Sequence, residues 1–151
     1  MKQAKHLILL SVCLFFGLTS ARADGRERPI SFAELPQAAQ TFCTTYFGDL
    51  TVAYIVADTK FTHTEYEVTY TDRTEVDFRT DGEWKSVERK YSSVPAAIVP
   101  AQIADFVAAN ELFRQQFIRK IERNRYTWEI ELSSGLEIKF NAKFDVIGYD
   151  D

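Results

Sequence analysis

Short runs in which apolar and polar residues alternate constrain this chain more than any other feature. Tyr66, Val68 and Tyr70, then Val76 and Phe78, occupy every second position of two neighbouring runs, and polar residues stand between them. Successive side chains of a strand point to opposite faces, so the pattern predicts strands with one buried and one solvated face. Antiparallel sheets commonly have two such faces. The chain is therefore expected to build an antiparallel sheet.

The strand-like runs form two groups of four, and each group follows a segment with helical periodicity. The first helix is predicted from Pro36 to Phe47, ending at Gly48, and the second from Ala101 to about Asn110. Turn signals such as Asp81-Gly82 and Ser134-Gly135 separate many of the runs. The runs cover residues 51–58, 66–71, 75–79 and 83–88, then 113–122, 126–132, 136–141 and 144–149.

The two groups can be aligned with each other. Residues 36–42 match residues 100–106, and Val76-Asp77-Phe78 matches Ile138-Lys139-Phe140. This similarity predicts an α+β fold made of a tandem repeat of α-β-β-β-β units, with antiparallel sheet or sheets and the helices packed on one face. The expected units are residues 33–90 and 91–151. Whether they share one continuous sheet is left open by the pattern.

Residues 1–23 have the pattern of a signal peptide. Lys2 and Lys5 precede an apolar run, and Ala21-Arg22-Ala23 provides a small-x-small cleavage site. The apolar run is about a dozen residues, whereas a membrane span needs about twenty. We therefore expect cleavage near Ala23, a flexible segment over residues 24–32, a periplasmic or secreted location, and no stable membrane insertion of the mature chain.

The charge of the expected mature chain restricts its partners. Cleavage removes three basic residues of 18 and none of the 22 acidic ones, which leaves a net charge of −7. Binding to nucleic acid or anionic lipid requires a clustered positive surface. The composition therefore argues against both and leaves an envelope or secreted protein as the expected partner, with the oligomeric state undetermined.

No residue set forms a catalytic signature. His63 is the only histidine after residue 23 and Cys43 the only cysteine, and no nucleophile motif accompanies them. Cys43 stands on an apolar helix face and is expected to be buried and inert. Asp58, His63 and Glu65 could meet a metal across one hairpin, but they match no metal-ligand motif. The sequence predicts a non-enzyme without cofactor or metal.

The polar positions of the strands are the candidate binding surface. They form a mainly acidic strip that suits a basic partner, although an ordinary solvated sheet face has the same pattern. Trp84, Tyr91, Phe144 and Tyr149 would replace this strip as the leading candidate if two or more of them were exposed together. The predicted binding residues are Glu67, Glu75, Asp77, Arg79, Trp84, Glu129, Glu131 and Tyr149.

Several segments resemble one family of exported bacterial proteins. They are Leu35-Pro36, Tyr66-Glu67-Val68, residues 76–84 ending in Gly82-Glu83-Trp84, Val94-Pro95 and residues 135–140. Over residues 33–149 the chain resembles the PepSY-like, β-lactamase-inhibitor-like proteins. The resemblance implies a periplasmic or secreted binding domain, similar in fold to a tandem-repeat inhibitor that docks a sheet face onto an enzyme, and it implies no target. The alternative is an envelope protein that binds a small ligand or metal in a pocket between helix and sheet.

Overall fold

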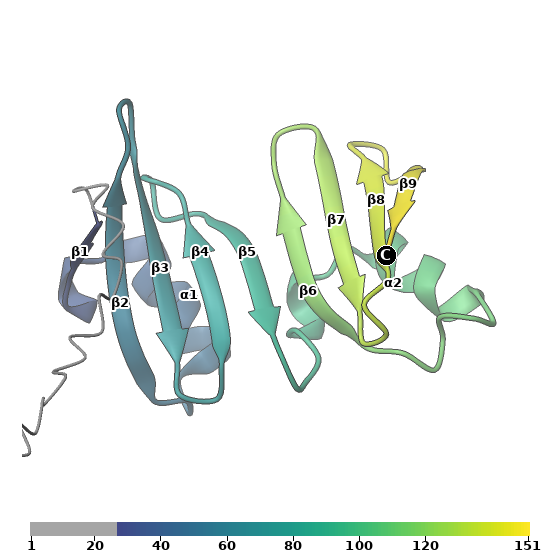
Figure 1. The fold of residues 1–151 in the computed structure, drawn as a ribbon, viewed down its shortest axis with the longest axis horizontal. Helices are drawn as coiled ribbons and strands as arrows, with labels where there is room; N and C mark the ends of the chain where they lie inside the picture. The colour runs from purple at the N-terminus through teal and green to yellow at the C-terminus, as the bar shows by residue number, and fades with distance from the viewer. Residues whose placement is uncertain (1–26) are drawn as a thin grey trace, which may run out of the picture.

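A computed structural model describes residues 27–151, so the predicted signal peptide lies outside the described residues. The described chain forms one nine-stranded antiparallel sheet in which each strand pairs with its neighbour in sequence (Figure 1). The strands are β1 (Glu27–Pro29), β2 (Val52–Thr59), β3 (Thr64–Tyr70), β4 (Thr74–Phe78), β5 (Trp84–Arg89), β6 (Ile118–Arg123), β7 (Thr127–Leu132), β8 (Glu137–Asn141) and β9 (Val146–Asp150).

Two short helices pack on one face of this sheet (Figure 1). They are α1 (Gln37–Phe47) and α2 (Ala101–Ala109), and single 3-10 turns at Phe32–Glu34 and Ala96–Ile98 precede them. Pro36 and Pro100 stand immediately before the two helices. A proline suits this position because the first backbone N–H groups of a helix have no partner inside it.

The prediction of a tandem repeat of α-β-β-β-β units is wrong. The chain builds a single sheet, and its strand β1 precedes the first helix. Strand β5 pairs directly with β6, where Val87 lies opposite Ile121 and both side chains are completely buried. Two separate four-stranded sheets would each leave unpaired backbone groups along two edges. Joining them at β5 and β6 removes two of those edges and creates one continuous apolar core.

Part of the segment predicted to be flexible is paired in the sheet. Glu27 lies opposite Asp58 and Pro29 opposite Val56, so these residues form an edge strand on β2. The Ile30 N–H extends the pairing by donating to the Ile55 carbonyl oxygen at 3.0 Å. Regular structure therefore starts before residue 32, because the outer backbone groups of β2 offer hydrogen bonds to this segment.

The core lies between the helices and the sheet. Phe42 of α1 meets Phe78 edge-on at 5.7 Å, and Phe106 of α2 meets Phe140 edge-on at 5.4 Å between ring centroids. The predicted burial of Cys43 is confirmed, and this burial raises the pKa of its thiol. Each helix thus contacts the sheet through at least one aromatic side chain on its apolar face.

The predicted strand over residues 113–122 begins only at Ile118. The N–H groups of Phe113 and Arg114 both donate to the Asn110 carbonyl oxygen, at 3.1 and 2.9 Å, and the Gln116 N–H donates to the Phe113 oxygen at 2.8 Å. These bonds continue the chain in turns after α2. Phe113 is buried, but it packs from a turn instead of the predicted strand.

Candidate functional site

The sheet face opposite the helices carries two continuous rows of side chains, which we name the carboxylate rows. Cross-strand pairing defines them, because residues directly opposite one another point to the same face. The first row contains Val56, Glu67, Asp77, Ser86, Glu122, Glu129, Lys139 and Gly148. The second row contains Tyr54, Thr69, Glu75, Glu88, Lys120, Glu131, Glu137 and Asp150.

Acidic residues lie directly opposite one another at five places in these rows. Like charges in this arrangement destabilise a sheet. The pairs are Glu67 with Asp77, Glu75 with Glu88, Glu122 with Glu129, Glu131 with Glu137, and Glu137 with Asp150. Five of the eight residues predicted to bind, namely Glu67, Glu75, Asp77, Glu129 and Glu131, therefore share one surface.

Basic side chains neutralise only part of this surface. Arg119 contacts Glu131 and lies 3.9 Å from Glu88, and Lys139 lies 3.6 Å from Glu129. Within residues 27–151, no basic nitrogen lies within 4 Å of the carboxylates of Glu67, Glu75 or Asp77.

The environment of Glu75 and Asp77 disfavours their charged form. Burial, with the neighbouring charge of Glu67, raises the pKa of Asp77 to about 6. Burial also raises the pKa of Glu75, and the charges of Glu67 and Glu88 add to the effect. A cation placed on these residues would favour ionisation and relieve the repulsion.

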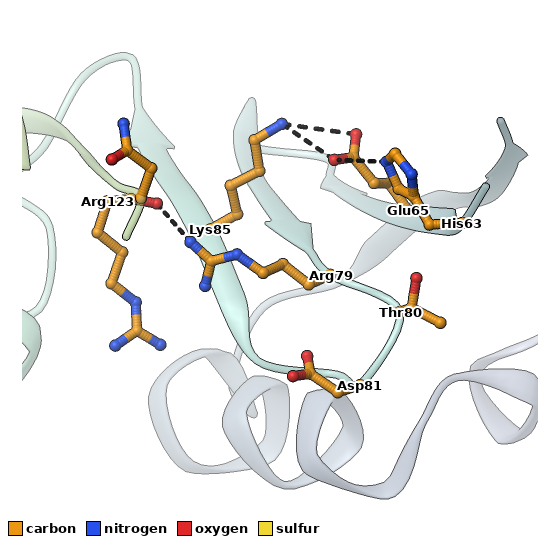
Figure 2. Close-up of a pocket in the computed structure, with 8 residues that line it drawn as sticks. His63, Glu65, Arg79, Thr80, Asp81, Lys85 and Arg123 are labelled. Atoms are coloured by element: carbon orange, nitrogen blue, oxygen red, sulfur yellow. Dashed lines mark hydrogen bonds and ion pairs between the residues drawn. The ribbon is translucent and has the colours of Figure 1, made fainter. Parts of the chain in front are cut away.

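A hollow of about 460 Å³, the basic hollow, lies beside the rows (Figure 2). Its lining residues are His63, Glu65, Arg79, Thr80, Asp81, Lys85, Arg123 and Asn124. Predicted residue Arg79 is fixed there by donating to the Trp84 carbonyl oxygen at 3.3 Å and to the Arg123 carbonyl oxygen at 2.6 Å. The first bond joins the turn after β4 to the start of β5, and the second joins it to the end of β6, 44 residues away in sequence.

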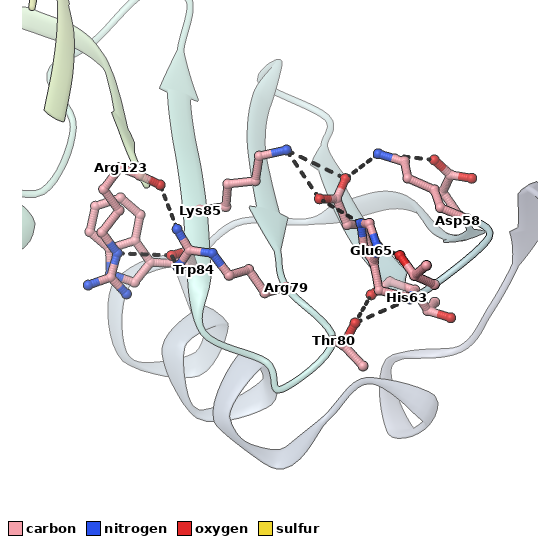
Figure 3. Close-up of polar contacts among 11 residues, drawn as sticks. Asp58, His63, Glu65, Arg79, Thr80, Trp84, Lys85 and Arg123 are labelled. Carbon is pink, nitrogen blue, oxygen red and sulfur yellow. Dashed lines mark hydrogen bonds and ion pairs between the residues drawn. The ribbon is translucent and has the colours of Figure 1, made fainter. Parts of the chain in front are cut away.

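Glu65 is the centre of an ion-pair network beside this hollow (Figure 3). It contacts Lys60, lies 3.3 Å from Lys85, and lies 3.5 Å from His63 Nε2. Partial burial alone would raise the pKa of Glu65, but the Lys60 hydrogen bond and the Lys85 charge lower it below its usual value. Lys60 also lies 3.7 Å from Asp58. The ammonium group of Lys60 thus contacts Asp58 and Glu65, two of the three residues that the sequence suggested as metal ligands.

A second hollow of about 400 Å³, the acidic hollow, adjoins the first and shares Glu65 and Lys85 with it. Its lining residues are Glu27, Tyr54, Val56, Asp58, Lys60, Glu65, Tyr66, Glu67, Asp77 and Lys85. Within residues 27–151, no group of three His, Cys, Asp or Glu side chains is arranged to hold a metal ion.

Trp84 is part of the core, unlike the other predicted binding residues. Its side chain is 8% exposed, and the Arg123 guanidinium lies over its ring at 4.1 Å from the centroid. Arg123 also donates to the Trp84 carbonyl oxygen at 3.0 Å and to Glu83 at 2.9 Å. This cation–π contact makes Trp84 a structural residue and leaves it unavailable as a docking side chain.

The aromatic residues considered from the sequence do not form one exposed patch. Tyr91 is 69% exposed and Tyr149 57% exposed. Tyr91 follows β5 and Tyr149 lies in β9, four strand spacings away, or about 19 Å. Phe144 is partly buried and lies 6.0 Å from Trp128. The carboxylate rows therefore remain the leading surface.

A further hollow of about 330 Å³ lies between α2 and β6, where the alternative of a pocket between helix and sheet would apply. It is mainly lined by small and apolar side chains: Ser93, Val94, Ala96, Val99, Ala104, Val107, Ala108, Arg114, Gln116, Phe117 and Ile118. No ionisable cluster converges there, because Arg114 is its only charged lining residue.

Sequence reasoning did not identify Lys85 and Arg123 as parts of this site. Lys85 follows the inward-facing Trp84, so alternation could have placed it on the open face. The β-bulge beside it, between Asp77 and Phe78, had no sequence signal. Arg123 reaches the site only because β6 pairs with β5, which the sequence pattern left open.

Comparisons with known proteins agree with this architecture. The family model described as "Putative beta-lactamase-inhibitor-like, PepSY-like" matches residues 64–148. None of the curated proteins compared with the chain matches it. Within residues 27–151, neither helix has the length and hydropathy of a membrane span.

Three solved structures from Bacteroides are similar over nearly their whole length. A putative periplasmic protein of the DUF2874 family from Bacteroides vulgatus is 40% identical, with a TM-score of 0.80, over 85% of this chain and 99% of that chain. A putative calcium-regulated periplasmic protein from Bacteroides thetaiotaomicron is 37% identical, with a TM-score of 0.78, over 83% and 97%. A second putative periplasmic protein from Bacteroides vulgatus is 31% identical, with a TM-score of 0.77, over 83% and 99%. The chain belongs to the PepSY-like, beta-lactamase-inhibitor-like family.

Proposed function

We propose that this protein is a non-enzymatic binding protein of the periplasm, and that its carboxylate rows bind a positively charged segment of another envelope or secreted protein. The observation that carries the proposal is the set of five acidic pairs on the sheet face opposite the helices. These pairs repel one another in the isolated protein, and a cationic partner would reduce that repulsion. The periplasmic relatives support the compartment.

The arrangement of the reactive side chains supports binding over turnover. The Cys43 thiol is buried, and burial raises its pKa, which disfavours the reactive thiolate. His63 is exposed and is placed against Glu65 and the hydroxyl of its neighbour Thr62, which is exposed as well. Complementary charge, in contrast, gives a protein interface specificity and a fast association rate without any reactive group.

A comparison of two charge-matched triple variants tests the proposal. Glu67→Gln, Glu75→Gln and Asp77→Asn together remove three charges from the rows. Asp49→Asn, Asp105→Asn and Glu111→Gln remove three charges from exposed positions outside them. We expect a partner from an envelope fraction to be retained by the wild-type protein and the second variant and lost by the first. Retention should weaken between about 50 and about 300 mM salt, as expected for screened charges.

Two outcomes of this experiment would contradict the proposal. One is reproducible failure to enrich any partner with the folded wild-type protein. The other is a partner that the row variant retains as well as the wild-type protein does, since such a partner would bind elsewhere. Circular dichroism and thermal unfolding of both variants confirm beforehand that each is folded.

Calcium does not fit the residues as they are arranged. One relative is described as calcium-regulated, and the rows are rich in carboxylates. A calcium site needs about six to eight converging oxygen ligands, whereas no group of three potential ligands forms within residues 27–151. Adding about 1 mM Ca²⁺ to the same binding experiment, a concentration in the range of extracellular calcium modules, should leave the retention of the partner unchanged.

A further inference from the structure

The two neighbouring hollows differ in charge although they share a wall. Glu65 and Lys85 form that wall. Five carboxylates and two ammonium groups line the acidic hollow, a composition that disfavours a bound anion there. Three permanent cations and two carboxylates line the basic hollow, and His63 adds to the positive side when protonated. The pair of hollows is therefore an electric dipole open to solvent.

Arg79 carries the uncompensated positive charge of the basic hollow. Its guanidinium donates to two backbone carbonyl oxygens, which hold it in place without cancelling its charge. Within residues 27–151, no carboxylate oxygen lies within 4 Å of its nitrogens. Glu65 does not compensate the charge of Arg79, because its carboxylate already forms ion pairs with Lys60 and Lys85. A fixed, planar guanidinium is suited to binding a carboxylate.

Asp77 and Glu67 form the uncompensated negative end. They lie directly opposite each other, and no basic nitrogen lies within 4 Å of either among the described residues. Thr69 donates a hydrogen bond to Glu67 at 3.0 Å, but this neutral group leaves the charge in place. Asp77 and Arg79 are two positions apart in sequence, a spacing of about 6.6 Å along an extended chain.

We propose that the paired hollows bind a ligand carrying both a carboxylate and an ammonium group, joined by about five methylene-sized units. The carboxylate would lie against Arg79 and the ammonium against Asp77 and Glu67. A free ω-amino acid and the C-terminal lysine of a peptide share this chemistry. This inference rests on the proposed function at its ammonium end only, because Arg79 lies outside the carboxylate rows.

The walls of the basic hollow suit such a ligand. Arg79, Lys85 and Arg123 line it, and such side chains combine a long aliphatic stem with a charged end. Their methylene groups would contact the methylene chain of the ligand. Both hollows have the size typical of small-molecule sites, roughly 300 to 1,000 Å³. The mutual contact of Glu65 and Lys85 keeps the two ends of the site apart.

Three probes of similar length test the proposal: 6-aminohexanoate, hexanoate and hexylamine. Chemical-shift titration of the full mature chain should show saturable binding of 6-aminohexanoate around residues 63–67 and 77–85. Hexanoate and hexylamine should each bind roughly tenfold more weakly, because each loses one charge-assisted contact. Arg79→Gln should reduce binding of 6-aminohexanoate to the level of hexylamine, and Asp77→Asn should reduce it toward that of hexanoate. Arg114→Gln, which removes a charge outside both hollows, should change nothing.

Titration of the wild-type protein tests the proposed ligand even if Arg79→Gln fails to fold after losing its two hydrogen bonds. Equal affinities for the three probes, or no saturable shift up to about 20 mM, a range in which a millimolar site would saturate, would overturn the proposal. So would a folded Arg79→Gln protein with unchanged affinity. If a partner binds the carboxylate rows but 6-aminohexanoate does not bind, only this inference fails. If 6-aminohexanoate binds and no partner is found, only the proposed function fails.

A peptide distinguishes the two sources of the ligand. The probe is acetyl-Gly-Gly-Lys with a free carboxylate, compared with the same peptide as its C-terminal amide. Binding of the free acid as tight as that of 6-aminohexanoate, with loss in the amide, supports the C-terminal lysine of a chain. Binding of 6-aminohexanoate without the peptide supports a free ω-amino acid.

Discussion

The two faces of this sheet are formed by the same strands but have opposite effects on stability. On the helix-covered face, Val68, Val76 and Phe78 are completely buried and pack against α1. On the open face of the same strands, Glu67 lies opposite Asp77 with no basic partner in contact among the described residues. The covered face thus stabilises the fold, while the open face contains a repulsion that the fold must tolerate. Residues that weaken a protein in this way are often functional.

The largest effect on stability should come from truncating a buried side chain on the helix-covered face. Phe140→Ala removes a completely buried ring that packs edge-on against Phe106, and we expect a loss of about 3–5 kcal/mol in the free energy of unfolding. Urea denaturation measures it. Phe117→Ala, at a position 39% exposed, is the matched control and should cost about 1 kcal/mol or less. Equal losses at the two positions would show that burial does not distinguish them.

A substitution at Gly82 tests how closely the β4–β5 turn packs against the start of α1. Gly82 has φ +83°, and an added Cβ would lie 2.7 Å from Pro36 Cβ and 3.0 Å from the Ala39 nitrogen. Gly82→Ala should therefore cost roughly 2–3 kcal/mol, from backbone strain plus steric overlap. Gly135→Ala is the control, since it has φ +99° but open space around the added Cβ. It should cost about 1–2 kcal/mol by thermal unfolding, and a larger loss at Gly135 would contradict the packing argument.

A substitution on the open face should stabilise the protein. Asp77 is charged at pH 7 in both states, but its folded-state pKa is about 6 because burial and Glu67 disfavour the charge. Asp77→Asn removes that cost, and we expect about 1 kcal/mol of added stability at pH 7, after a discount for partial exposure to solvent. Asp49→Asn, at an exposed position, should change stability by less than about 0.5 kcal/mol.

The pH dependence of this effect has a defined sign. The folded protein holds the Asp77 proton more tightly than the unfolded chain, whose pKa stays near the ordinary value of 3.8. The cost of the Asp77 charge to the wild-type protein should therefore shrink as the pH falls from 7 through about 6 toward 4, and the advantage of Asp77→Asn over the wild-type protein should disappear over that window. Urea denaturation at a series of pH values measures this change. An advantage that persists at pH 4 would show that the charge is not its cause.

The smallest effect should come from a neutralised pair on the open face. Lys139 lies 3.6 Å from Glu129, and their side chains are 49% and 32% exposed. Lys139→Gln should cost less than about 0.5 kcal/mol in denaturation experiments at low salt, because solvent screens such pairs. A loss above about 1 kcal/mol would mean that the rows form a tighter charge network than pairwise contacts indicate.

Much of the local structure follows from sequence patterns. The helix predicted from Pro36 to Phe47 matches α1, and the second predicted helix matches α2 to within a residue. The alternation around Glu67 and Asp77 correctly places both on one face. The prediction of a tandem repeat failed at the joining of β5 and β6, because the alternation within a strand does not say which strand lies beside it.

The candidate site could be predicted only in part for the same reason. Glu67, Glu75 and Asp77 are recognisable as the polar positions of neighbouring strands. Trp84 was predicted to be a binding residue because its burial could not be seen in the sequence. The residue that covers its ring, Arg123, lies 39 positions away. The two hollows were not foreseen, since they form where turns from distant parts of the chain meet.

The sequence by itself determined the alternation that separates an apolar from an acidic sheet face, the two helix positions and the burial of Cys43. Each of these depends on the spacing of side chains along a short segment. Only the tertiary structure decided that nine strands form one sheet, that acids face acids across it, and that Arg79 remains without a carboxylate among the described residues. Those features depend on strand register and on contacts between distant segments, which local periodicity does not specify.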